Sequence, residues 1–411
     1  MHILFIAHYF QPEPNFFFAL PFAEALVKQG HSVEVLAGLP NYPSGKIYEG
    51  YKKASLLQRE VMNGIPVMRT PLYPSHDRSS LKRIISYSSL SLTQACVGPF
   101  SARKADVAYV CQGPATIGLP AVAMKLLRKI PFVYHIQDLW PDSLTATGMF
   151  NNRAGIAIIN KWCNFVYSQA GKVTVISPGM KEILCSRGVP ESKISVVYNW
   201  CDEQALFENP AATECLTDVR NLFKGKFNIV YAGNIGKAQA LDSVINAAEI
   251  LEKRNPAVQF VLIGEGVEKE NLRRMVEDKS IRNVKFIPRK PLSEINSLLN
   301  CADVLLVHLS DNDLFKITIP SKIQAYLAAG KPIMAGVRGD AANLVEAAKA
   351  GLSCKSEDPQ DIAAVAEKFS RLDREELLRM GINGKEFYRQ ELSFDIGVNR
   401  FINIFKETAA N

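Results

Sequence analysis

The chain of 411 residues lacks several features that would each assign it to a class. It has no uninterrupted apolar run of about 18 residues, the length that a membrane-spanning helix needs. Its eight cysteines include no C-x-x-C pair, so we expect reduced, structural cysteines and neither a disulfide framework nor a zinc site. The opening MHILFIAHYF has no basic segment ahead of its apolar residues, which predicts a buried first strand and not a secretory signal. We therefore expect a cytoplasmic protein.

The positive charge of the chain is concentrated in its first half. Residues 1–200 carry 20 Lys and Arg against 11 Asp and Glu, whereas residues 201–411 carry 28 against 30. Net charge indicates which partners a protein binds and not how it folds. A basic first half therefore indicates contact with membrane lipid, phosphate or nucleic acid. Because no basic pattern interleaved with aromatic residues is present, we expect no nucleic-acid partner.

Short apolar runs alternate with helical patterns along the whole chain. Continuous apolar strands separated by helices predict parallel sheets covered on both faces, and the length suits two such α/β domains. We expect a first Rossmann-like domain at 1–198, a second at 199–385, and a C-terminal helix at 386–411 that returns to the first domain. The expected strands are residues 2–7, 32–37, 66–70, 106–111, 132–136, 172–176 and 194–197, then 227–231, 259–263, 284–287, 304–308 and 332–335.

The stretch IVYAGNIGKAQALD at 229–242 has the pattern of an anion site, in which an apolar strand runs into a glycine turn and then a helix. Gly233 and Gly236 let the backbone turn tightly and approach a ligand. The helix that follows presents unpaired N–H groups, and Lys237 adds a full positive charge. The pattern predicts a diphosphate cradle; the alternative is that any strand–helix unit needs glycine in its turn.

Several ordered motifs carry a family resemblance across nearly the whole chain. YAGNIGKAQALDSVINAA, FVLIGEGVEKENL and IPSKIQAYLAAGKPIMAGVRGDAANLV resemble the donor-binding domain of GT-B retaining glycosyltransferases of family 4. HYFQPEPNFF, GHSVEVLAGLPNYPSGKIYEGY and HIQDLWPDS are similar to its WbuB-like and WcaI-like branch, which builds bacterial O-antigen, capsule and exopolysaccharide. The resemblance implies two Rossmann-like domains facing across a cleft and metal-independent sugar transfer from a nucleotide diphosphate, UDP by preference, with no cofactor.

The resemblance also implies donor contacts at the strand ends of the second half. Lys237 would stabilise the charge that builds on the leaving diphosphate. Most family members carry two Glu separated by seven residues, and those positions are Ile317 and Ala325 here, so Ser321, Lys322 and Gln324 are the candidates that replace them. The other expected donor-binding residues are Gly233, Asn234, Gly264, Glu265, Arg289, Gly339 and Asp340.

In the first half, His135 ends a predicted strand where the family places a His or an acid against the donor sugar. We expect a catalytic role for His135, against the alternative of a structural histidine. Asp138 would orient His135 or an acceptor hydroxyl, or cap the next segment. The expected acceptor-binding residues are His8, Asn15, Asn41 and Tyr42, and for Asn41 and Tyr42 turn chemistry is the alternative.

The acceptor that the resemblance implies is a polyprenyl-diphosphate-linked sugar at the inner face of the cytoplasmic membrane. The segment 81–104 has basic pairs at both ends and an uncharged middle, too polar to span a bilayer but suited to lie on one. The basic and apolar MKLLRK at 124–129 would add to such a surface. The alternative for the longer segment is an ordinary buried helix.

Two other functional classes remain open. A non-hydrolysing UDP-N-acetylglucosamine 2-epimerase shares the two-domain architecture, and a non-catalytic nucleotide-binding subunit would fit the absent Glu pair. Product analysis on the nucleotide sugar alone separates the first, and nucleotide binding without turnover marks the second. The sugar also stays open, because the WbuB likeness indicates an N-acetylated deoxyhexose such as L-FucNAc and the WcaI likeness indicates fucose from GDP.

Overall fold

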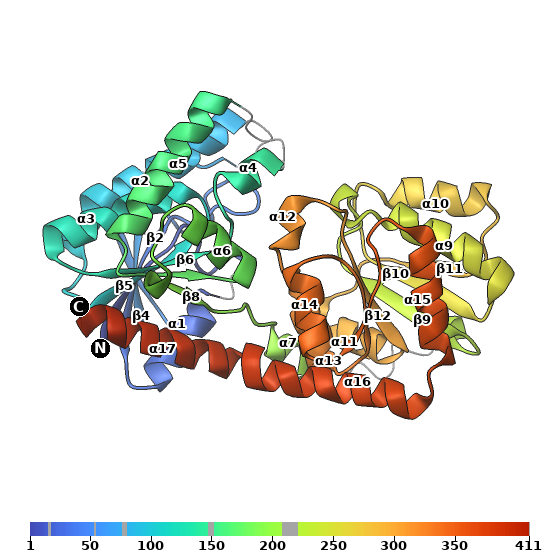
Figure 1. Ribbon diagram of the computed structural model, residues 1–411. Coiled ribbons are helices and arrows are strands. Elements are labelled where there is room, and N and C mark those ends of the chain that lie inside the picture. Colours follow the sequence, from blue (N-terminus) through green and yellow to red (C-terminus); the bar gives the residue numbers. More distant parts are fainter. Residues whose placement is uncertain (15–17, 53–54, 76–79, 147–151, 208–220, 411) are drawn as a thin grey trace. The chain divides into compact units, whose positions relative to one another are not determined.

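The computed structural model describes residues 1–14, 18–52, 55–75, 80–146, 152–207 and 221–410 (Figure 1). The chain forms two compact units: Met1–Val197 with Val398–Asn411, and Tyr198–Gly397. The last residues of the chain therefore belong to the first unit. In the described ranges no helix combines the length and the hydropathy that crossing a bilayer requires.

The first unit is built on an eight-stranded sheet in the order β3-β4-β2-β1-β5-β6-β7-β8. All neighbouring strands are parallel except β3, which is antiparallel to β4. The sequence pattern misses β3 because only alternate residues of this edge strand face inward. The strands are β1 His2–Ile6, β2 Ser32–Gly38, β3 Gln58–Met62, β4 Ile65–Thr70, β5 Val107–Gln112, β6 Phe132–Ile136, β7 Lys172–Val175 and β8 Ile194–Val196.

Helices cover the first sheet, and one of them comes from the far end of the chain. Phe401 on α17 packs against Phe22 on α1 and Tyr109 on β5, with ring centroids 5.2 and 5.4 Å apart. This aromatic contact holds the C-terminal helix on the first unit. The helices are α1 Leu20–Lys28, α2 Ser80–Ser101, α3 Gly118–Arg128, α4 Asp142–Ala146, α5 Arg153–Gln169, α6 Pro178–Ser186 and α17 Phe394–Ala410.

The second unit has six parallel strands in the order β11-β10-β9-β12-β13-β14. The order reverses between β9 and β12, as in a dinucleotide-binding sheet. The sequence pattern predicts all of these strands except β14, which has only three residues. The strands are β9 Phe227–Ala232, β10 Val258–Ile263, β11 Val284–Ile287, β12 Val304–His308, β13 Ile333–Gly336 and β14 Gly351–Ser353.

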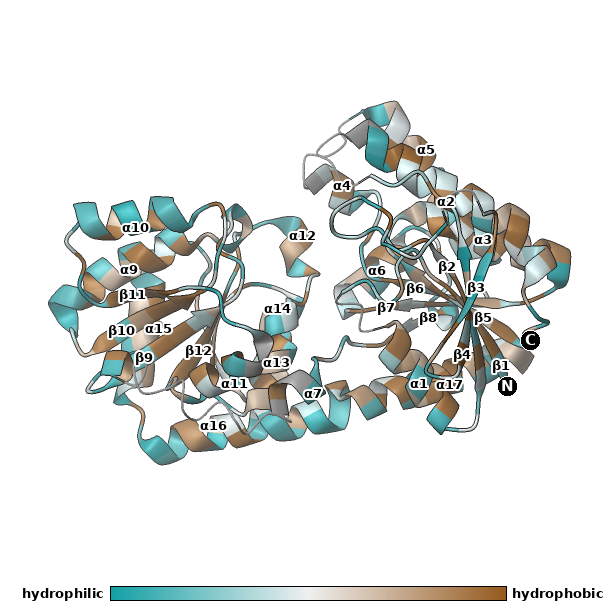
Figure 2. Ribbon diagram, turned by 180° about the vertical axis from the view of Figure 1, so that it is seen from behind, coloured by the Kyte–Doolittle hydropathy of each residue, from teal (hydrophilic) through white to brown (hydrophobic). Residues whose placement is uncertain are grey.

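Two of the long helices of the second unit, α15 and α16, start at side-chain caps. Asp358 accepts the Gln360 and Asp361 N–H groups at the start of α15, and Asp373 forms a capping box with Glu376 at the start of α16. Figure 2 shows the strands as hydrophobic and α10 as largely hydrophilic. The helices are α7 Glu203–Phe207, α9 Leu241–Arg254, α10 Lys269–Asp278, α11 Leu292–Asn300, α12 Asp313–Lys316, α13 Ser321–Ala329, α14 Asp340–Ala347, α15 Pro359–Arg371 and α16 Arg374–Phe387.

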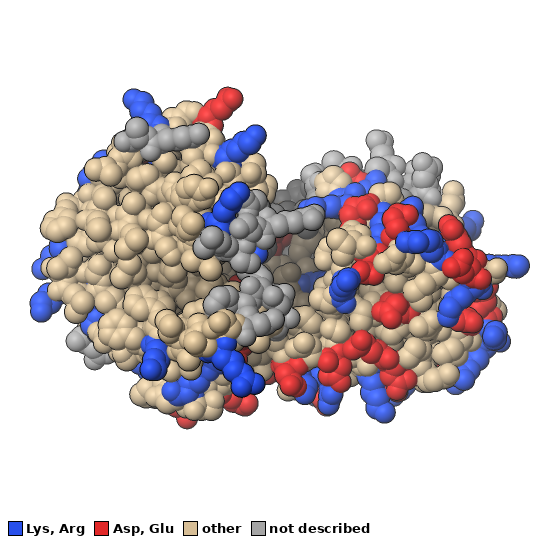
Figure 3. All heavy atoms as spheres, turned by 90° about the horizontal axis from the view of Figure 1, so that it is seen from above, with Lys and Arg blue, Asp and Glu red and all other residues tan. Residues whose placement is uncertain are grey.

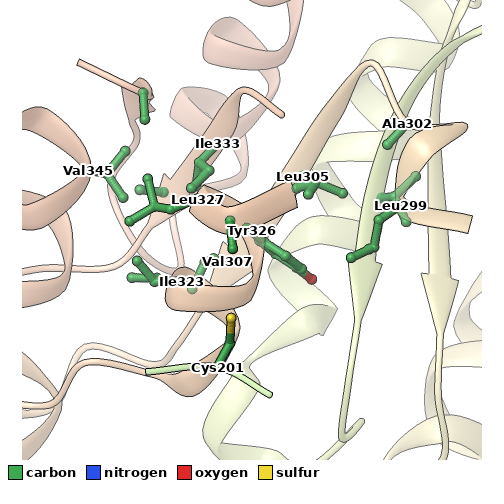
Figure 4. Packing of buried hydrophobic residues seen from close by; sticks show 14 of the residues in the cluster. Cys201, Leu299, Ala302, Leu305, Val307, Ile323, Tyr326, Leu327, Ile333 and Val345 are labelled. Carbon is green, nitrogen blue, oxygen red and sulfur yellow. The ribbon is translucent and has the colours of Figure 1, made fainter. Parts of the chain in front are cut away.

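The position of α13 is fixed by the core of the second unit. Its residues Ile323, Tyr326 and Leu327 pack in one buried cluster with strand residues such as Leu305 (Figure 4). The Tyr326 hydroxyl accepts a hydrogen bond from the Ala232 N–H at 2.9 Å and lies 3.2 Å from the Ala232 carbonyl. The start of α13 is thereby held beside the end of β9.

Candidate active site

The carboxyl edge of the second sheet has its strand-order reversal between β9 and β12, and such a switch point is where open parallel sheets bind ligands. The turn after β9 contains the short 3-10 helix η4 (Lys237–Gln239). It is tied to the end of β12, because the Ser310 N–H donates to the Ala238 carbonyl at 2.9 Å. The predicted diphosphate stretch therefore lies at the switch point.

The glycines of this edge have a shared steric reason. Gly233 has a φ of +149°, and a Cβ there would lie 2.9 Å from the Lys322 Nζ. A Cβ on Gly264 would lie 1.9 Å from the Gly233 carbonyl oxygen, and one on Gly266 would lie 2.1 Å from that of Ile235. The turns after β9 and β10 thus pack backbone against backbone, which accounts for Gly264 and Gly266 without a ligand.

Lys322, in the first turn of α13, points its ammonium group into the turn after β9. Its Nζ lies 3.7 Å from the centroid of the Tyr231 ring, a cation–π contact. Across the described ranges it has no carboxylate partner, and burial lowers its pKa to about 7. A half-buried cation without a counter-ion is a candidate ligand-binding group, since an anion beside it would stabilise its charged form.

Lys237 and Asn234 are exposed on the same turn. The Asn234 amide lies 3.4 Å from the Gln239 Oε1, which also accepts the Gly236 N–H at 3.1 Å. The Lys237 side chain makes no hydrogen bond or ion pair with any residue that the structure describes, and only its backbone carbonyl is bonded, to the Ala240 N–H. Gly233, Asn234 and Lys237 thus lie on the turn into which Lys322 points, so this turn has two lysines beside it.

His308 supports this turn from beneath, and the sequence analysis missed it. It is buried at the end of β12, and its Nδ1 lies 2.7 Å from the Gln239 carbonyl oxygen. Gly336 leaves room for it, because a Cβ there would lie 2.3 Å from the His308 Cδ2. The sequence did contain a signal for His308, because this polar residue ends the apolar run VLLVH.

Glu265 and Arg289 lie at the neighbouring strand ends. The Glu265 carboxylate pairs with Lys269 at 2.5 Å and accepts the Arg289 backbone N–H, and both interactions lower its pKa. The carboxylate is thus already engaged by the protein, whereas the Arg289 side chain is exposed. The donor contact expected of Glu265 would compete with this ion pair.

Among the residues expected to replace the Glu pair, Gln324 is a correction. It is 1% exposed, and with its amide nitrogen turned toward α13 it donates to the Pro320 and Ser321 carbonyls at 2.9 and 3.0 Å. This geometry closes the side chain on its own helix and away from a donor. Ser321 is exposed, and Ala325 packs on the core.

Gly339 and Asp340 lie at the start of α14. Gly339 has a φ of +66°, and a Cβ there would lie 1.9 Å from the Lys316 carbonyl oxygen. Only glycine therefore fits this close approach of two loops. Asp340 is the first residue of α14, where a negative charge suits the positive end of the helix dipole. The fold alone therefore explains both residues, and their predicted donor contact stays a prediction.

In the first unit, His135 is completely buried at the end of β6. Its Nδ1 lies 2.7 Å from the Thr174 Oγ1, its Nε2 contacts the Gln137 amide, and Phe18 and Phe401 cover its ring at 4.6 and 5.1 Å between centroids. Burial lowers its pKa to about 3. A neutral imidazole enclosed by α17 favours the structural alternative over the catalytic role expected of it.

Asp138 follows β6 with an exposed side chain. The surrounding protein desolvates its carboxyl group enough to raise its pKa. Its carbonyl accepts the Gln112 amide at 3.0 Å, which ties it to the end of β5. The carboxylate does not orient His135 in any hydrogen bond of the described chain, and the acceptor contact and the capping role both stay predictions.

The expected acceptor residues divide in two. Asn41 is buried and donates its amide to the Leu39 carbonyl at 3.0 Å, so its side chain is turned inward, contrary to expectation. Tyr42 is half-buried, with its ring 5.4 Å from that of Tyr9. His8 is buried at the switch point between β1 and β5, and its Nδ1 has no hydrogen-bond partner among the residues that the structure describes. Asn15 lies outside the described residues.

Two buried charges that the sequence analysis missed organise these loops. Glu13 accepts backbone N–H groups from Phe10, Asn41 and Tyr42 at 3.1, 2.8 and 2.9 Å. Arg69 donates to Glu60 at 2.7 Å and to the Gly38 carbonyl at 3.1 Å. Both side chains are buried, and both hold the loops at the carboxyl edge of the first sheet.

Two family models match the chain. The model described as a glycosyl transferase 4-like domain matches residues 18–200, and the one described as glycosyl transferases group 1 matches residues 216–387. Among curated proteins, the chain is 29% identical over 315 residues to the Escherichia coli protein named as colanic acid biosynthesis glycosyl transferase WcaI, covering 75% of each chain. It is 24% identical over 331 residues to the Pseudomonas aeruginosa protein named as glycosyltransferase WbjE, covering 79% of this chain and 81% of that one.

Solved structures resemble the whole chain. The Anabaena protein HepE in complex with UDP superposes with a TM-score of 0.72 at 15% identity, over 99% of this chain and 100% of that one. An Escherichia coli structure titled as trehalose-6-phosphate bound with UDP-2-fluoro glucose superposes with a TM-score of 0.72 at 12% identity, over 99% of both chains. At these identities the likeness concerns the fold alone.

Proposed function

The chain belongs to the GT-B glycosyltransferases of family 4, and we propose that it moves a sugar, with retention of configuration, from UDP to a lipid-linked acceptor. Its two parallel-sheet units and its structural neighbours confirm the fold expected from the sequence. The identity of the donor, the retention of configuration and the identity of the acceptor are what we propose.

The observation that carries the proposal is the pair of unpartnered lysines at the switch point of the second sheet. Lys237 is exposed on the turn after β9, and the Lys322 ammonium group points from α13 into the same turn, beside Gly233. A diphosphate carries the negative charge that would balance these two lysines. The choice of UDP is supported by the structural neighbours, whose titles name UDP or a UDP sugar.

In the proposed reaction, these lysines stabilise the charge that develops on the diphosphate as the bond to the sugar breaks. The acceptor oxygen bonds to the anomeric carbon on the face that the leaving diphosphate vacates, which gives retention. The donor phosphate accepts the proton of the acceptor hydroxyl. We propose that the two ammonium groups supply the positive charge that a metal ion supplies in other transferases. Asp138, with its raised pKa, would contact the acceptor from the first unit.

The names of the curated relatives WcaI and WcaL, which include colanic acid biosynthesis, support a role in the assembly of a polysaccharide. We propose a polyprenyl-diphosphate-linked sugar as acceptor, used at the inner face of the cytoplasmic membrane in the assembly of a bacterial surface glycan. An N-acetylated deoxyhexose such as L-FucNAc is the proposed donor sugar. A basic first half suits an anionic lipid carrier at an anionic surface.

Titration calorimetry with UDP, GDP and ADP tests the donor site directly. We expect UDP to bind the wild type, and Lys322→Ala and Lys237→Ala to weaken binding. Lys253→Ala, which removes an exposed lysine at the end of α9, is the matched control and should bind as the wild type does. If none of the three nucleotides binds, the diphosphate site is wrong. Product analysis with UDP-N-acetylglucosamine alone would reveal an epimerase.

A further inference from the structure

Three helices of the first unit carry charged residues of one sign only. Together α2, α3 and α5 carry six basic residues and no Asp or Glu. Surface helices of soluble proteins normally mix both signs, as α10 does with three basic and three acidic residues. The six basic residues are Lys82, Arg83, Lys125, Arg128, Arg153 and Lys161.

The three helices form one continuous surface. Helix α2 packs against α3, and α3 packs against α5. The Arg128 guanidinium, at the end of α3, donates to the Ala102 carbonyl just after α2 at 3.3 Å, and the Lys125 ammonium donates to the Gln169 carbonyl at the end of α5 at 2.7 Å. Basic side chains of α3 thus join all three helices.

Large apolar side chains are exposed on each of these helices. On α2, Ile85, Leu92 and Phe100 are spaced by seven and eight residues and so lie on one stripe, while Leu90 and Gln94 on the opposite side are buried. The helix is therefore not buried on all sides, as the alternative reading required, but packs with its inner side and exposes apolar residues on its outer side. The exposed apolar residues are Ile84, Ile85, Leu92, Phe100, Leu126, Leu127, Ile158 and Phe165.

The space-filling view agrees with this distribution. In Figure 3 the first unit, at the left, shows a broad uncharged area whose margins carry mainly Lys and Arg and a few Asp or Glu. The second unit shows Lys, Arg, Asp and Glu side chains intermixed over its visible face. Single exposed apolar residues are normal on a soluble protein, but a group of them without any acidic residue marks an interaction surface.

The inner side of α2 touches the loop that carries the candidate acceptor residues. The Tyr87 ring lies 5.2 Å from the His8 ring between centroids, and its carbonyl accepts the Thr116 hydroxyl at 3.3 Å. The same helix thus has an exposed apolar stripe on one side and a contact with His8 on the other.

We infer that α2, α3 and α5 form one docking face for an anionic bilayer surface. This inference rests on the proposed function, because a lipid-linked acceptor has to be taken from such a surface. The apolar side chains enter the boundary between headgroups and acyl chains, while the exposed Lys82, Arg153 and Lys161 contact lipid phosphates and no Asp or Glu of these helices opposes them.

Vesicle sedimentation of the full chain, without donor or acceptor, tests the face. The probes are phosphatidylcholine vesicles with and without phosphatidylglycerol. The matched pair of variants is Leu92→Glu on α2 and Leu378→Glu on α16, because the two leucines are 55% and 60% exposed in α-helices of the two units. We expect the wild type to bind the anionic vesicles, Leu92→Glu to bind them about tenfold more weakly, and Leu378→Glu to bind unchanged.

Two results would overturn the inference. One is no sedimentation of the wild type with either vesicle, and the other is equal behaviour of the two variants. If gel filtration without lipid shows a dimer that Leu92→Glu dissociates, the face is an interface between two copies and not a lipid surface. UDP calorimetry on the same samples reports the donor site separately, so failure of docking and failure of the proposed function are distinguishable.

Discussion

The carboxyl edges of the two sheets treat their charged side chains in opposite ways. At the first edge Arg69 is fully buried and bonded to Glu60 and two backbone carbonyls, and the buried Glu13 accepts three backbone N–H groups. At the second edge Lys322 and Lys237 have no acidic partner within the described ranges, although Lys322 contacts the Tyr231 ring. Arg69 and Glu13 are thus used in holding loops, whereas Lys322 and Lys237 remain available to an anionic ligand. Substitutions should therefore reduce stability at the first edge and binding at the second.

Replacing Arg69 should give the largest effect. Arg69→Met keeps an apolar stem but removes the guanidinium, which leaves the Gly38 and Gln11 carbonyls unpaired in the interior. We expect the free energy of unfolding of the first unit to fall by about 3 kcal/mol. Urea unfolding measures it, with Arg59→Met on the exposed side of β3 as the control. Equal losses in the two variants would show that the buried network does not hold this edge.

Replacing Lys322 should give the opposite pattern. Lys322→Met removes a cation that has no counter-ion, so the free energy of unfolding should stay the same or rise. The loss of one charged contact to a diphosphate should weaken UDP binding by about 2 kcal/mol, or roughly thirtyfold. Calorimetry and urea unfolding of the same variant test both expectations. A destabilised variant with unchanged UDP affinity would assign Lys322 to the framework and remove the contrast between the two edges.

The two strand-end histidines offer a smaller contrast. His308 holds the Gln239 carbonyl in the turn after β9, whereas His135 is enclosed by aromatic rings. We expect His308→Ala to weaken UDP binding by about 1 kcal/mol through a displaced turn, and His135→Ala to leave UDP affinity unchanged. Both variants should lose some stability. A His135→Ala protein that folds and binds UDP but transfers no sugar would restore the catalytic role expected from the sequence.

Much of this architecture could be predicted because continuous apolar runs mark buried parallel strands wherever they are long enough. The edge strand β3 and the three-residue β14 gave no such run. The turn after β9 was found because glycine and lysine there follow a strand directly. The direction in which a polar side chain points could not be predicted in the same way. His135 is covered by Phe401, far along the chain, and Gln324 bonds to its own helix. Such orientations depend on tertiary partners that a local pattern does not contain.

The final test concerns the proton on Lys322. Burial lowers its pKa from 10.5 to about 7, so the unfolded chain binds more protons than the folded one between these values, and the contribution of Lys322 to stability rises with pH across that window. A bound diphosphate should raise the pKa again. At about pH 8, UDP binding should therefore take up a fraction of a proton, and well below pH 7 it should take up none at this site. Calorimetry in two buffers of different ionisation enthalpy measures the uptake, and Lys322→Met should abolish it. The same uptake in that variant would mean that another group receives the proton and that Lys322 does not face the diphosphate.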